Sequence, residues 1–327
     1  MDTPHNTPSR SALVLGASGG VGGEIASALL SHGWQVRALV RDSAKAQSSA
    51  RGALSGIEWV SGDAMNAADV LSAATDVQLI VHAVNPPGYR DWDRLVLPML
   101  ENSIAAARIH GARIALPGTV YNFGPDAFPT LRIDSPQNPL SSKGRIRAEM
   151  ENRLKAASQQ GVPVLIIRAG DFFGPHPGNN WFSQGLVKPG THLKSISYPG
   201  TAGVGHTWAY LPDLGETFAR LADIQATLPT FARYHFAGYW DADGTAITSA
   251  IKRALKRQDI TVKALPWGIL AIVALFNETV RGLREVRLYW QRSVSLDNSE
   301  LVKVLGEEPH TPLEVAIQTT LHSLKVT

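Results

Sequence analysis

The chain has 327 residues, of which 44% are apolar and 18% charged, and its formal net charge at pH 7 is +3. This composition is too apolar for a disordered chain and is typical of a globular protein with one large domain, or with a domain and a smaller lobe. The chain has no cysteine, which excludes disulfides, thiolate metal sites and cysteine nucleophiles. Lys and Arg are scattered without a basic run, which argues against a nucleic-acid partner.

The N-terminal segment and the most apolar stretch bear on the compartment. Residues 1–8 are polar and acidic, whereas a secretory signal begins with a basic and then an apolar segment. The most apolar stretch, residues 264–276, contains Pro266 and Gly268 and is shorter than the ~20 apolar residues that cross a bilayer. We therefore expect a cytoplasmic protein without a membrane span.

Apolar runs that alternate with amphipathic segments predict a parallel sheet with helical crossovers. The expected strands cover residues 12–16, 36–40, 57–60, 77–83, 112–116 and 164–168. The expected helices cover residues 20–32, where Gly33 ends the pattern, and residues 67–74, 91–110 and 142–160. The first six strands therefore predict an α/β domain over residues 1–170.

The sequence changes in character after Gly170. Residues 171–212 are rich in Gly, Pro and aromatic side chains and show little periodicity. Helices are expected again at residues 213–226, 245–256, 267–284 and 313–324. We expect residues 171–327 to form mainly a smaller lobe, with some segments, such as 213–226, returning to the sheet of the first domain.

A glycine-rich turn joins the first expected strand to the first expected helix. Gly16, Gly19 and Gly22 have the spacing of a dinucleotide-binding turn: the first permits a tight exit, the second lets the backbone approach a pyrophosphate, and the third lets the helix pack on the sheet. Free N–H groups at the helix start favour a phosphate. The alternative is a turn that binds nothing. We expect the cofactor to bind at this turn, which comprises Gly16, Ser18, Gly19, Gly20, Val21 and Gly22.

The end of the second strand bears on the choice of nicotinamide cofactor. An NAD site usually has an acid there that binds the ribose 2′-hydroxyl, but this chain has Val40 followed by Arg41. An Arg can contact a 2′-phosphate, which favours NADP, while a surface role for Arg41 or an inward turn of Asp42 would leave NAD possible. After the third strand, Asp63 and Ala64 are expected near the adenine. Asp63 could also cap the helix near residues 67–74.

The glycine turn and the residues after the third strand resemble those of the extended and atypical short-chain dehydrogenases/reductases, the NAD(P)-dependent epimerase/dehydratase family. Further segments resemble this family in the same order along nearly the whole chain. The resemblance implies a Rossmann-type doubly wound parallel sheet that binds the cofactor, and a small C-terminal lobe that binds substrate over the nicotinamide. It also implies that Ala83 and Val84 line the cofactor. The matching segments are residues 16–22, 62–63, 81–84, 119–124, 168–175, 210–214 and 305–312.

The resemblance fails at the residues that carry the family's chemistry. That chemistry uses a Ser or Thr, a Tyr, and a Lys four residues after the Tyr. Aligning this chain with the family places Pro117 at the hydroxyl residue, Ser141 at the Tyr and Arg145 at the Lys, so all three roles are changed. Arg145 stays charged and cannot share a proton. The nearest substitutes are Thr119 and Tyr121. The catalytic candidates are therefore these two residues, together with Ser141 and Arg145 at the changed positions.

Two polar residues of the lobe are candidates for substrate binding. Asp171 stands where the family often has Asn, and either binds substrate or caps the turn before Gly174. His206 stands where some members place an Arg that binds phosphate, but it could equally be a loop residue bonded to backbone. Nearby aromatic side chains either line an apolar cleft or fill the core of the lobe. These are Trp181, Phe182, Trp208 and Tyr210.

We therefore expect an NADP-dependent oxidoreductase or epimerase-like enzyme with a non-standard catalytic site and no metal. A sensor that binds NADP(H) without turnover is the alternative. A sugar-nucleotide epimerase is disfavoured by the loss of the Tyr and Lys. The expected partner is a small molecule, and a homodimer could form through the helices at 91–110 and 142–160 unless their apolar faces cover the chain's own sheet.

Overall fold

The fold was analysed in a computed structural model, which describes residues 10–50, 52–86, 91–176, 178, 180–276 and 278–327. Its central sheet has seven strands in the order β11-β7-β5-β4-β1-β2-β3, and each neighbouring pair is parallel. The chain runs outward from β1 to β3 and then returns to β4 on the other side, as in a doubly wound fold. The Rossmann-type fold expected from the sequence is therefore confirmed. The strands are β1 (Ser11–Leu15), β2 (Gln35–Val40), β3 (Glu58–Ser61), β4 (Leu79–His82), β5 (Arg113–Thr119), β7 (Val164–Ala169) and β11 (Phe231–His235).

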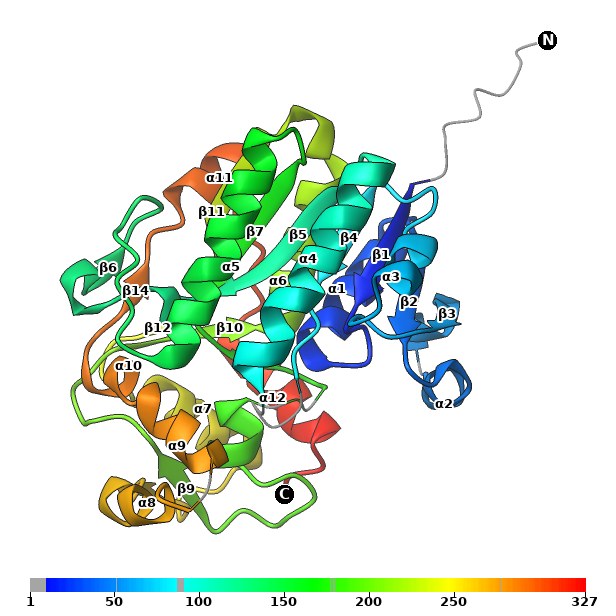
Figure 1. Cartoon of the computed structure of the whole chain (residues 1–327). Helices are drawn as coiled ribbons and strands as arrows, with labels where there is room; N and C mark the ends of the chain where they lie inside the picture. The colour runs from blue at the N-terminus through cyan, green and yellow to red at the C-terminus, as the bar shows by residue number, and fades with distance from the viewer. Residues whose placement is uncertain (1–9, 51, 87–90, 177, 179, 277) are drawn as a thin grey trace.

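Helices cover both faces of this sheet (Figure 1). One face is covered by α3 (Ala67–Ala73), α4 (Trp92–His110) and α5 (Ser142–Gln159). The other is covered by α1 (Gly20–Ser31), α6 (Leu211–Asp223) and α11 (Ser299–Leu305). Because both faces are covered, the central strands read as continuous apolar runs, and every residue of β7 is buried.

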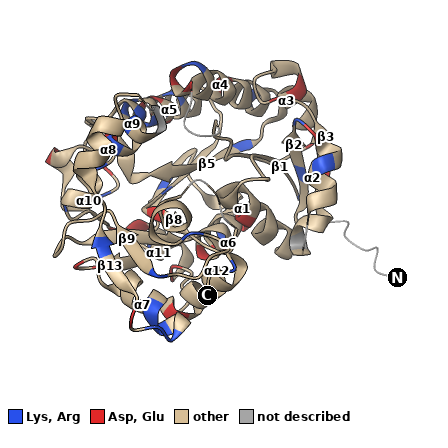
Figure 2. Ribbon diagram, turned by 90° about the horizontal axis from the view of Figure 1, so that it is seen from below, with Lys and Arg blue, Asp and Glu red and all other residues tan. Residues whose placement is uncertain are grey.

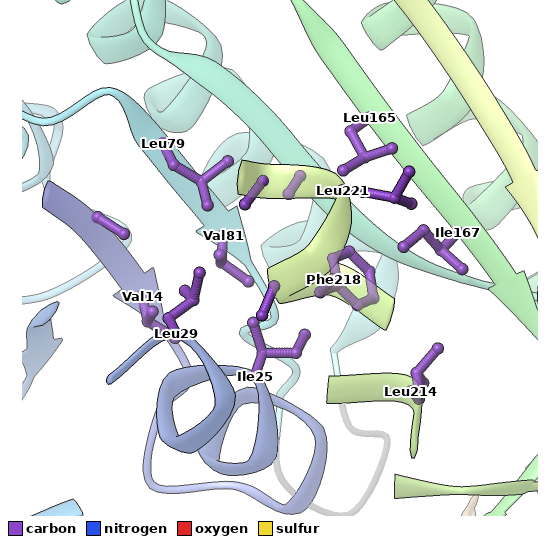
Figure 3. Close-up of a cluster of buried hydrophobic side chains, with 14 of the residues drawn as sticks. Val14, Ile25, Leu29, Leu79, Val81, Leu165, Ile167, Leu214, Phe218 and Leu221 are labelled. Carbon is purple, nitrogen blue, oxygen red and sulfur yellow. The ribbon is translucent and has the colours of Figure 1, made fainter. Parts of the chain in front are cut away.

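Helix α6 belongs to the later half of the sequence but packs on the sheet beside α1. Its side chains Leu214, Phe218 and Leu221 enter the same buried cluster as the inward residues of α1, β1, β4 and β7 (Figure 3). The two helices approach closely at Gly215, where a Cβ would lie 2.7 Å from the carbonyl oxygen of Glu24. A side chain at Gly215 would therefore force α1 and α6 apart.

The apolar residues of α4 and α5 face the sheet. Leu100, Ile104, Met150 and Leu154 are all at most 4% exposed within the single chain. The apolar faces that suggested a homodimer therefore cover the protein's own core, and they give no support to a dimer through these helices.

The lobe has its own small sheets and an aromatic core. Its elements are β8 (Asp171–Phe173), β9 (Ser195–Tyr198), β10 (His206–Tyr210), β12 (Tyr239–Asp241), β13 (Thr261–Ala264), α7 (Ala246–Leu255), α8 (Trp267–Val273), α9 (Glu278–Glu285), α10 (Leu288–Gln291) and α12 (Leu313–Ser323). Strand β10 lies between β12 and β8, and β13 pairs with β9. Trp208 is fully buried against Phe173 and Phe182, and Tyr210 also packs on Phe173, so the core role is correct for these aromatic residues.

The remaining elements are short, and one expected helix is divided. They comprise α2 (Ser43–Ser49), the paired strands β6 (Thr130–Leu131) and β14 (Ser295–Leu296), and single turns at Gly52–Gly56, Val120–Asn122, Pro125–Ala127, Phe182–Leu186 and Gln225–Thr227. The prediction of one helix over 267–284 is wrong, because α8 ends at Val273 and α9 begins only at Glu278. Among the helices of the described residues, none combines the length and apolar character that a bilayer span requires.

The junction of α1 and α6 contains a titratable contact. His32 follows α1, and its Nδ1 lies 2.6 Å from Asp223 while its Nε2 lies 3.0 Å from Glu216, both on α6. Partial burial lowers the pKa of His32, but the bonds to Asp223 and Glu216 outweigh it, so the net pKa is raised above the ordinary 6.5.

We predict that this junction loses stability in mildly alkaline solution. A raised pKa in the folded state contributes stability that is complete below the unfolded value and is lost as the pH rises through the folded value. The melting temperature should therefore fall from about pH 6 to about pH 8.5, where both carboxylates stay ionised and His32 loses its proton. His32→Gln should flatten this part of the profile, whereas the exposed control His322→Gln should not. An identical profile in His32→Gln and the wild-type protein would contradict the assignment.

Candidate functional site

The glycine turn after β1 has the geometry that a bound pyrophosphate requires. Gly16 has φ +93°, and a Cβ there would lie 2.5 Å from the carbonyl oxygen of Ala83. A Cβ at Gly22 would lie 2.3 Å from the carbonyl oxygen of Gly16, so this position also accepts only glycine. Gly19 is exposed, precedes α1 as its N-cap and offers no side-chain cap to the first turn. The N-terminus of α1 therefore presents bare backbone to an anion.

One cleft of about 720 Å³ runs from this turn into the lobe. It lies at the carboxyl ends of the strands, where the strand order reverses between β1 and β4, which is the usual ligand site of a doubly wound sheet. The structure brings together on this cleft all the residues expected at the cofactor: Gly16, Ser18, Gly19, Gly20, Val21, Gly22, Arg41, Asp63, Ala64, Ala83 and Val84.

At the end of the cleft beside β2, the structure shows which of Arg41 and Asp42 faces the cleft. Val40 and Arg41 line the cleft. The carboxylate of Asp42 instead accepts a hydrogen bond of 2.9 Å from the backbone N of Lys45 and caps α2. The inward turn of Asp42 that would favour NAD is therefore not the conformation in this structure.

Asp63 also lines the cleft, but it does not cap the next helix. Its Oδ1 accepts a hydrogen bond from the backbone N of Met65, at 2.9 Å. The N-cap of α3 is Asn66, whose side chain accepts from Ala68 N. The expectation that Asp63 caps this helix is wrong, because the turn at Met65 separates it from the helix start.

Three residues that are far apart in the sequence form a series of hydrogen bonds at the end of the cleft that faces the lobe. Tyr121 Oη donates to Asp171 Oδ1 at 2.6 Å, and His206 Nε2 lies 2.9 Å from Asp171 Oδ2. Tyr121 and Asp171 line the cleft, while His206 lies behind them and stacks on Trp290 at 3.7 Å between ring centres. The side chains of Asp171 and His206 are only 10% and 8% exposed.

These hydrogen bonds distinguish between the two roles that the sequence left open for Asp171 and for His206. Asp171 does not cap the turn before Gly174, because both of its carboxylate oxygens are bonded to side chains. His206 does contact backbone, with Nδ1 3.3 Å from the carbonyl oxygen of Tyr289, but it also pairs with Asp171. Thr119 lines the cleft, and its Oγ1 accepts from Tyr121 N at 3.2 Å, which caps the turn that carries the phenol.

The two positions aligned with the family's Tyr and Lys lie outside the cleft lining. Ser141 is 6% exposed and caps α5, since its Oγ accepts from Gly144 N at 2.9 Å. Arg145 donates to the carbonyl oxygen of Leu140 at 3.0 Å. Two residues further along α5, a rotation of about 200°, Arg147 does line the cleft.

Arg147, which the sequence did not identify as a site residue, forms a pair of cations with Lys143 on this face of α5. Lys143 and Arg147 are four residues apart, so they lie on one side of the helix. Both charged groups approach the ring of Trp92, at 5.9 Å and 5.2 Å from its centre. Their spacing equals that of the family's Tyr and Lys, and this spacing was the signal that could have identified them.

His82, at the end of β4, is a second cleft residue that was not predicted from the sequence as a site residue. It lines the cleft, and its Nδ1 lies 2.8 Å from Ser103 Oγ. Complete burial, with a smaller effect of Arg147, lowers the pKa of His82 to about 3. The ring is therefore neutral at pH 7 and adds no charge to the cleft.

The lobe side of the cleft is mainly apolar. Its lining includes the side chains of Trp92, Leu95, Met99, Phe172, Trp181, Leu265, Leu270 and Leu283. Among the described residues that line the cleft, the Lys and Arg residues are Arg41, which follows β2, and Arg147, which lies on α5. Elsewhere Lys and Arg are spread over several helices, including α2, α5, α7 and α9 (Figure 2). Of the four aromatic residues considered for the lobe, Trp181 lines the cleft, whereas Phe182, Trp208 and Tyr210 do not.

A family model and several known proteins match this chain. Residues 16–172 match a family model described as NAD(P)H-binding. A reductase from a Streptomyces species, named 3-diazoavenalumate denitrifying reductase, is 30% identical over 184 residues. That match covers 51% of this chain and 57% of the relative's length.

Solved structures share the whole fold at low identity. UDP-glucuronic acid 4-epimerase from Bacillus cereus, in complex with NAD, has a TM-score of 0.74 and 16% identity, with 96% of each chain covered. The Bordetella bronchiseptica enzyme WbmH, in complex with NAD+, has a TM-score of 0.70 and 17% identity, with 97% of this chain and 98% of that chain covered.

Residues 16–172 thus carry the match to the NAD(P)H-binding family model, and the chain as a whole has the fold of these solved structures, which is the fold that the sequence resemblance implied.

We predict that Gly19→Val abolishes cofactor binding and leaves the fold intact. A Cβ at Gly19 would lie 3.3 Å from the nearest atom, Gly16 O, so a small shift accommodates it, but the side chain would occupy the space of the pyrophosphate. Titration of NADPH fluorescence should show at least a tenfold loss of affinity, about 1.4 kcal/mol, with an unchanged circular dichroism spectrum. Gly268→Val is the control, since no atom lies within 4 Å of a Cβ there. Retained affinity in folded Gly19→Val would mean that the turn does not hold the cofactor.

Proposed function

We propose that the protein is an NADPH-dependent reductase of a small, mainly apolar and aromatic compound with a reducible carbonyl group. The observation that carries the proposal is the single cleft that joins a glycine turn at one end to the phenol of Tyr121 and an apolar wall at the other. NADPH, when bound, supplies the hydride. The chain supplies the turn that holds the pyrophosphate and a hydroxyl group at the substrate end.

The proposed preference for NADPH rests on the end of β2. Arg41 lines the cleft where a 2′-phosphate would lie, and its guanidinium can bind that phosphate through charge-assisted hydrogen bonds. Asp42, the acid that follows Arg41 in the sequence, is committed to the cap of α2. An NAD site would need a carboxylate here, and Val40 provides none.

The proposed substrate class rests on the lining of the lobe side. Trp181, Phe172 and the leucines around it offer apolar and aromatic surface, which suits a planar hydrophobic molecule. His206, which aligns with the phosphate-binding Arg of some family members, is buried and paired with Asp171, so it does not offer a charge to the diphosphate of a sugar nucleotide. The reductase relative supports reduction rather than epimerisation, at 30% identity over about half of the chain.

Activity assays distinguish this proposal from a sensor that binds NADP(H) without turnover. We predict oxidation of NADPH, followed by the loss of absorbance at about 340 nm, with planar aromatic carbonyl probes such as 9,10-phenanthrenequinone. UDP-glucose and UDP-glucuronic acid should give no turnover and no isomerised product. Tight NADPH binding with no oxidation across the carbonyl panel would favour the sensor, and turnover of a UDP-sugar would favour the epimerase.

We predict that Arg41→Ala weakens NADPH binding and leaves NADH binding nearly unchanged. Loss of hydrogen bonds to a charged group should cost about 1–3 kcal/mol of binding free energy, a loss of roughly 5- to 150-fold in affinity. Titration of both cofactors by fluorescence checks this, with Lys45→Ala as control, because Lys45 is exposed on α2 outside the cleft lining. Equal affinity of the wild-type protein for the two cofactors would contradict the NADPH preference.

A further inference from the structure

Helix α8 forms the outer end of the lobe, at the lower edge of the molecule in Figure 1, and it exposes apolar side chains. Within the described part of the chain, twelve large apolar side chains are exposed, and five of them fall in residues 269–276. Phe276 is 88% exposed and Leu275 is 69% exposed. A contiguous group of this kind, unlike a single exposed apolar side chain, marks a surface that contacts a protein or a membrane. We call these five residues the apolar tip: Ile269, Ile272, Val273, Leu275 and Phe276.

The fold of the lobe uses a different side of α8. Trp267 Nε1 donates to the carbonyl oxygen of Pro199 at 2.9 Å, and the guanidinium group of Arg287 lies 5.2 Å from the centre of its ring. Leu270 lines the cleft. In the described structure, the residues of the apolar tip lie outside the buried aromatic core of the lobe, so packing within the chain does not account for their apolar character.

Exposed cations lie close to the apolar tip. Arg281 is exposed on α9, and its Nε donates to the carbonyl oxygen of Ala274, at the end of α8, at 3.3 Å. Arg284 is also exposed, and because it is three residues from Arg281 it lies on the same side of α9. Lys263 is exposed on β13, shortly before α8 begins. The apolar tip therefore has positive charge beside it on two elements.

The positive charge of the chain is concentrated in this part of the lobe. Residues 245–292 contain nine Lys and Arg against three Asp and Glu, a net charge of +6, whereas the whole chain has +3. Two of these cations, both at α7, pair with acids. Glu285, one of the three acids, turns towards α5, where its Oε2 accepts from Ser142 N at 3.0 Å. An anionic surface is therefore the electrostatic complement of this end of the lobe.

We propose that this end of the lobe docks on the surface of an anionic bilayer. The apolar tip inserts among the lipid headgroups, and Lys263, Arg281 and Arg284 contact the headgroup phosphates. Helix α8 has seven residues, so it lies in the interface and does not span the bilayer. A second copy of the chain fits this surface less well, because a two-fold pair would bring the same cations of both copies together. The proposal goes beyond the reductase function and does not depend on it.

The segment that would dock also forms part of the cleft wall. Leu270 of α8 and Leu283 of α9 line the cleft, together with Leu265 just before α8. Ile269, the residue before Leu270, is exposed on the outer surface. Docking therefore places the apolar wall of the cleft one helix away from the lipid, and an apolar compound dissolved in the bilayer has a short path to the cleft.

The first test measures flotation of the full chain with extruded vesicles in a density gradient. The wild-type protein should float with vesicles of phosphatidylcholine and phosphatidylglycerol in equal parts, and much less with vesicles of phosphatidylcholine alone. Leu275→Ser combined with Phe276→Ser should lower the partition coefficient roughly tenfold, because it removes the two most exposed apolar side chains. Ile109→Ser is the matched control, since Ile109 is 65% exposed on α4, and it should leave flotation unchanged.

The second test changes the charges. Arg281→Gln and Arg284→Gln should each weaken binding to the anionic vesicles about fivefold, which corresponds to about 1 kcal/mol, and added salt should weaken binding of the wild-type protein. Lys155→Gln, at an exposed position of α5, should have no effect. Circular dichroism and NADPH titration should be unchanged in every variant of both tests, because the replaced residues lie outside the cleft lining.

The outcomes separate a membrane from a second copy of the chain. Light scattering should give a monomeric mass for the wild-type protein without vesicles. A wild-type dimer that the change of Leu275 and Phe276 to Ser converts into a monomer would assign the apolar tip to self-association and overturn the proposal. Absence of wild-type flotation, equal flotation of the Ser variant, or equal binding to neutral and anionic vesicles would overturn it as well. The reductase function is tested separately with soluble carbonyl probes, so its failure would leave this proposal in place.

Discussion

The position of the substrate end of the cleft depends on one buried ion pair between Arg168 and Glu151. The two side chains are at most 5% exposed, and Arg168 Nη2 donates to Glu151 Oε2 at 2.6 Å. The remaining hydrogen-bonding groups are used as well: Arg168 Nη1 donates to His235 on β11, and Glu151 accepts from Asn122 beside Tyr121. Removal of one partner from such a pair typically costs about 3–5 kcal/mol, because the other charge stays buried. The pair therefore joins α5, two strands and the turn that carries the phenol.

From this ion pair the chain continues directly to Asp171, which is hydrogen-bonded to Tyr121 and His206. After Arg168, β7 ends and the chain passes through Gly170, where a Cβ would lie 2.2 Å from the carbonyl oxygen of Thr207. Only glycine permits this approach, which lets β8 pair with β10 and brings Asp171 to His206. The Arg168–Glu151 pair and Gly170 thus position three side chains that come from separate parts of the sequence. These side chains are Tyr121, Asp171 and His206.

The sequence predicted those features that depend on local pattern, and it failed where contacts are made between distant segments. Periodicity and the glycine spacing were sufficient for the parallel sheet and for the turn at Gly16, because each depends on residues close in the chain. The misplacement of Ser141 and Arg145 arose in the irregular segment before α5, where no period fixes the register and a shift of two residues turns a side chain to another face. The link from Tyr121 through Asp171 to His206 has no local signal at all, since it depends on the pairing of β8 with β10.

The return of the chain to the central sheet also limits how the protein can be divided. A fragment that ends near residue 170 would retain the glycine turn but lose α6 and β11, which come later in the sequence. One face of its sheet would expose the residues that Phe218 and Leu221 cover, and β7 would become an open edge with unpaired backbone groups. We therefore do not expect residues 1–170 to fold by themselves. An exchange of the lobe for that of another protein would have to replace separate segments before and after α6, because α6 belongs to the central sheet.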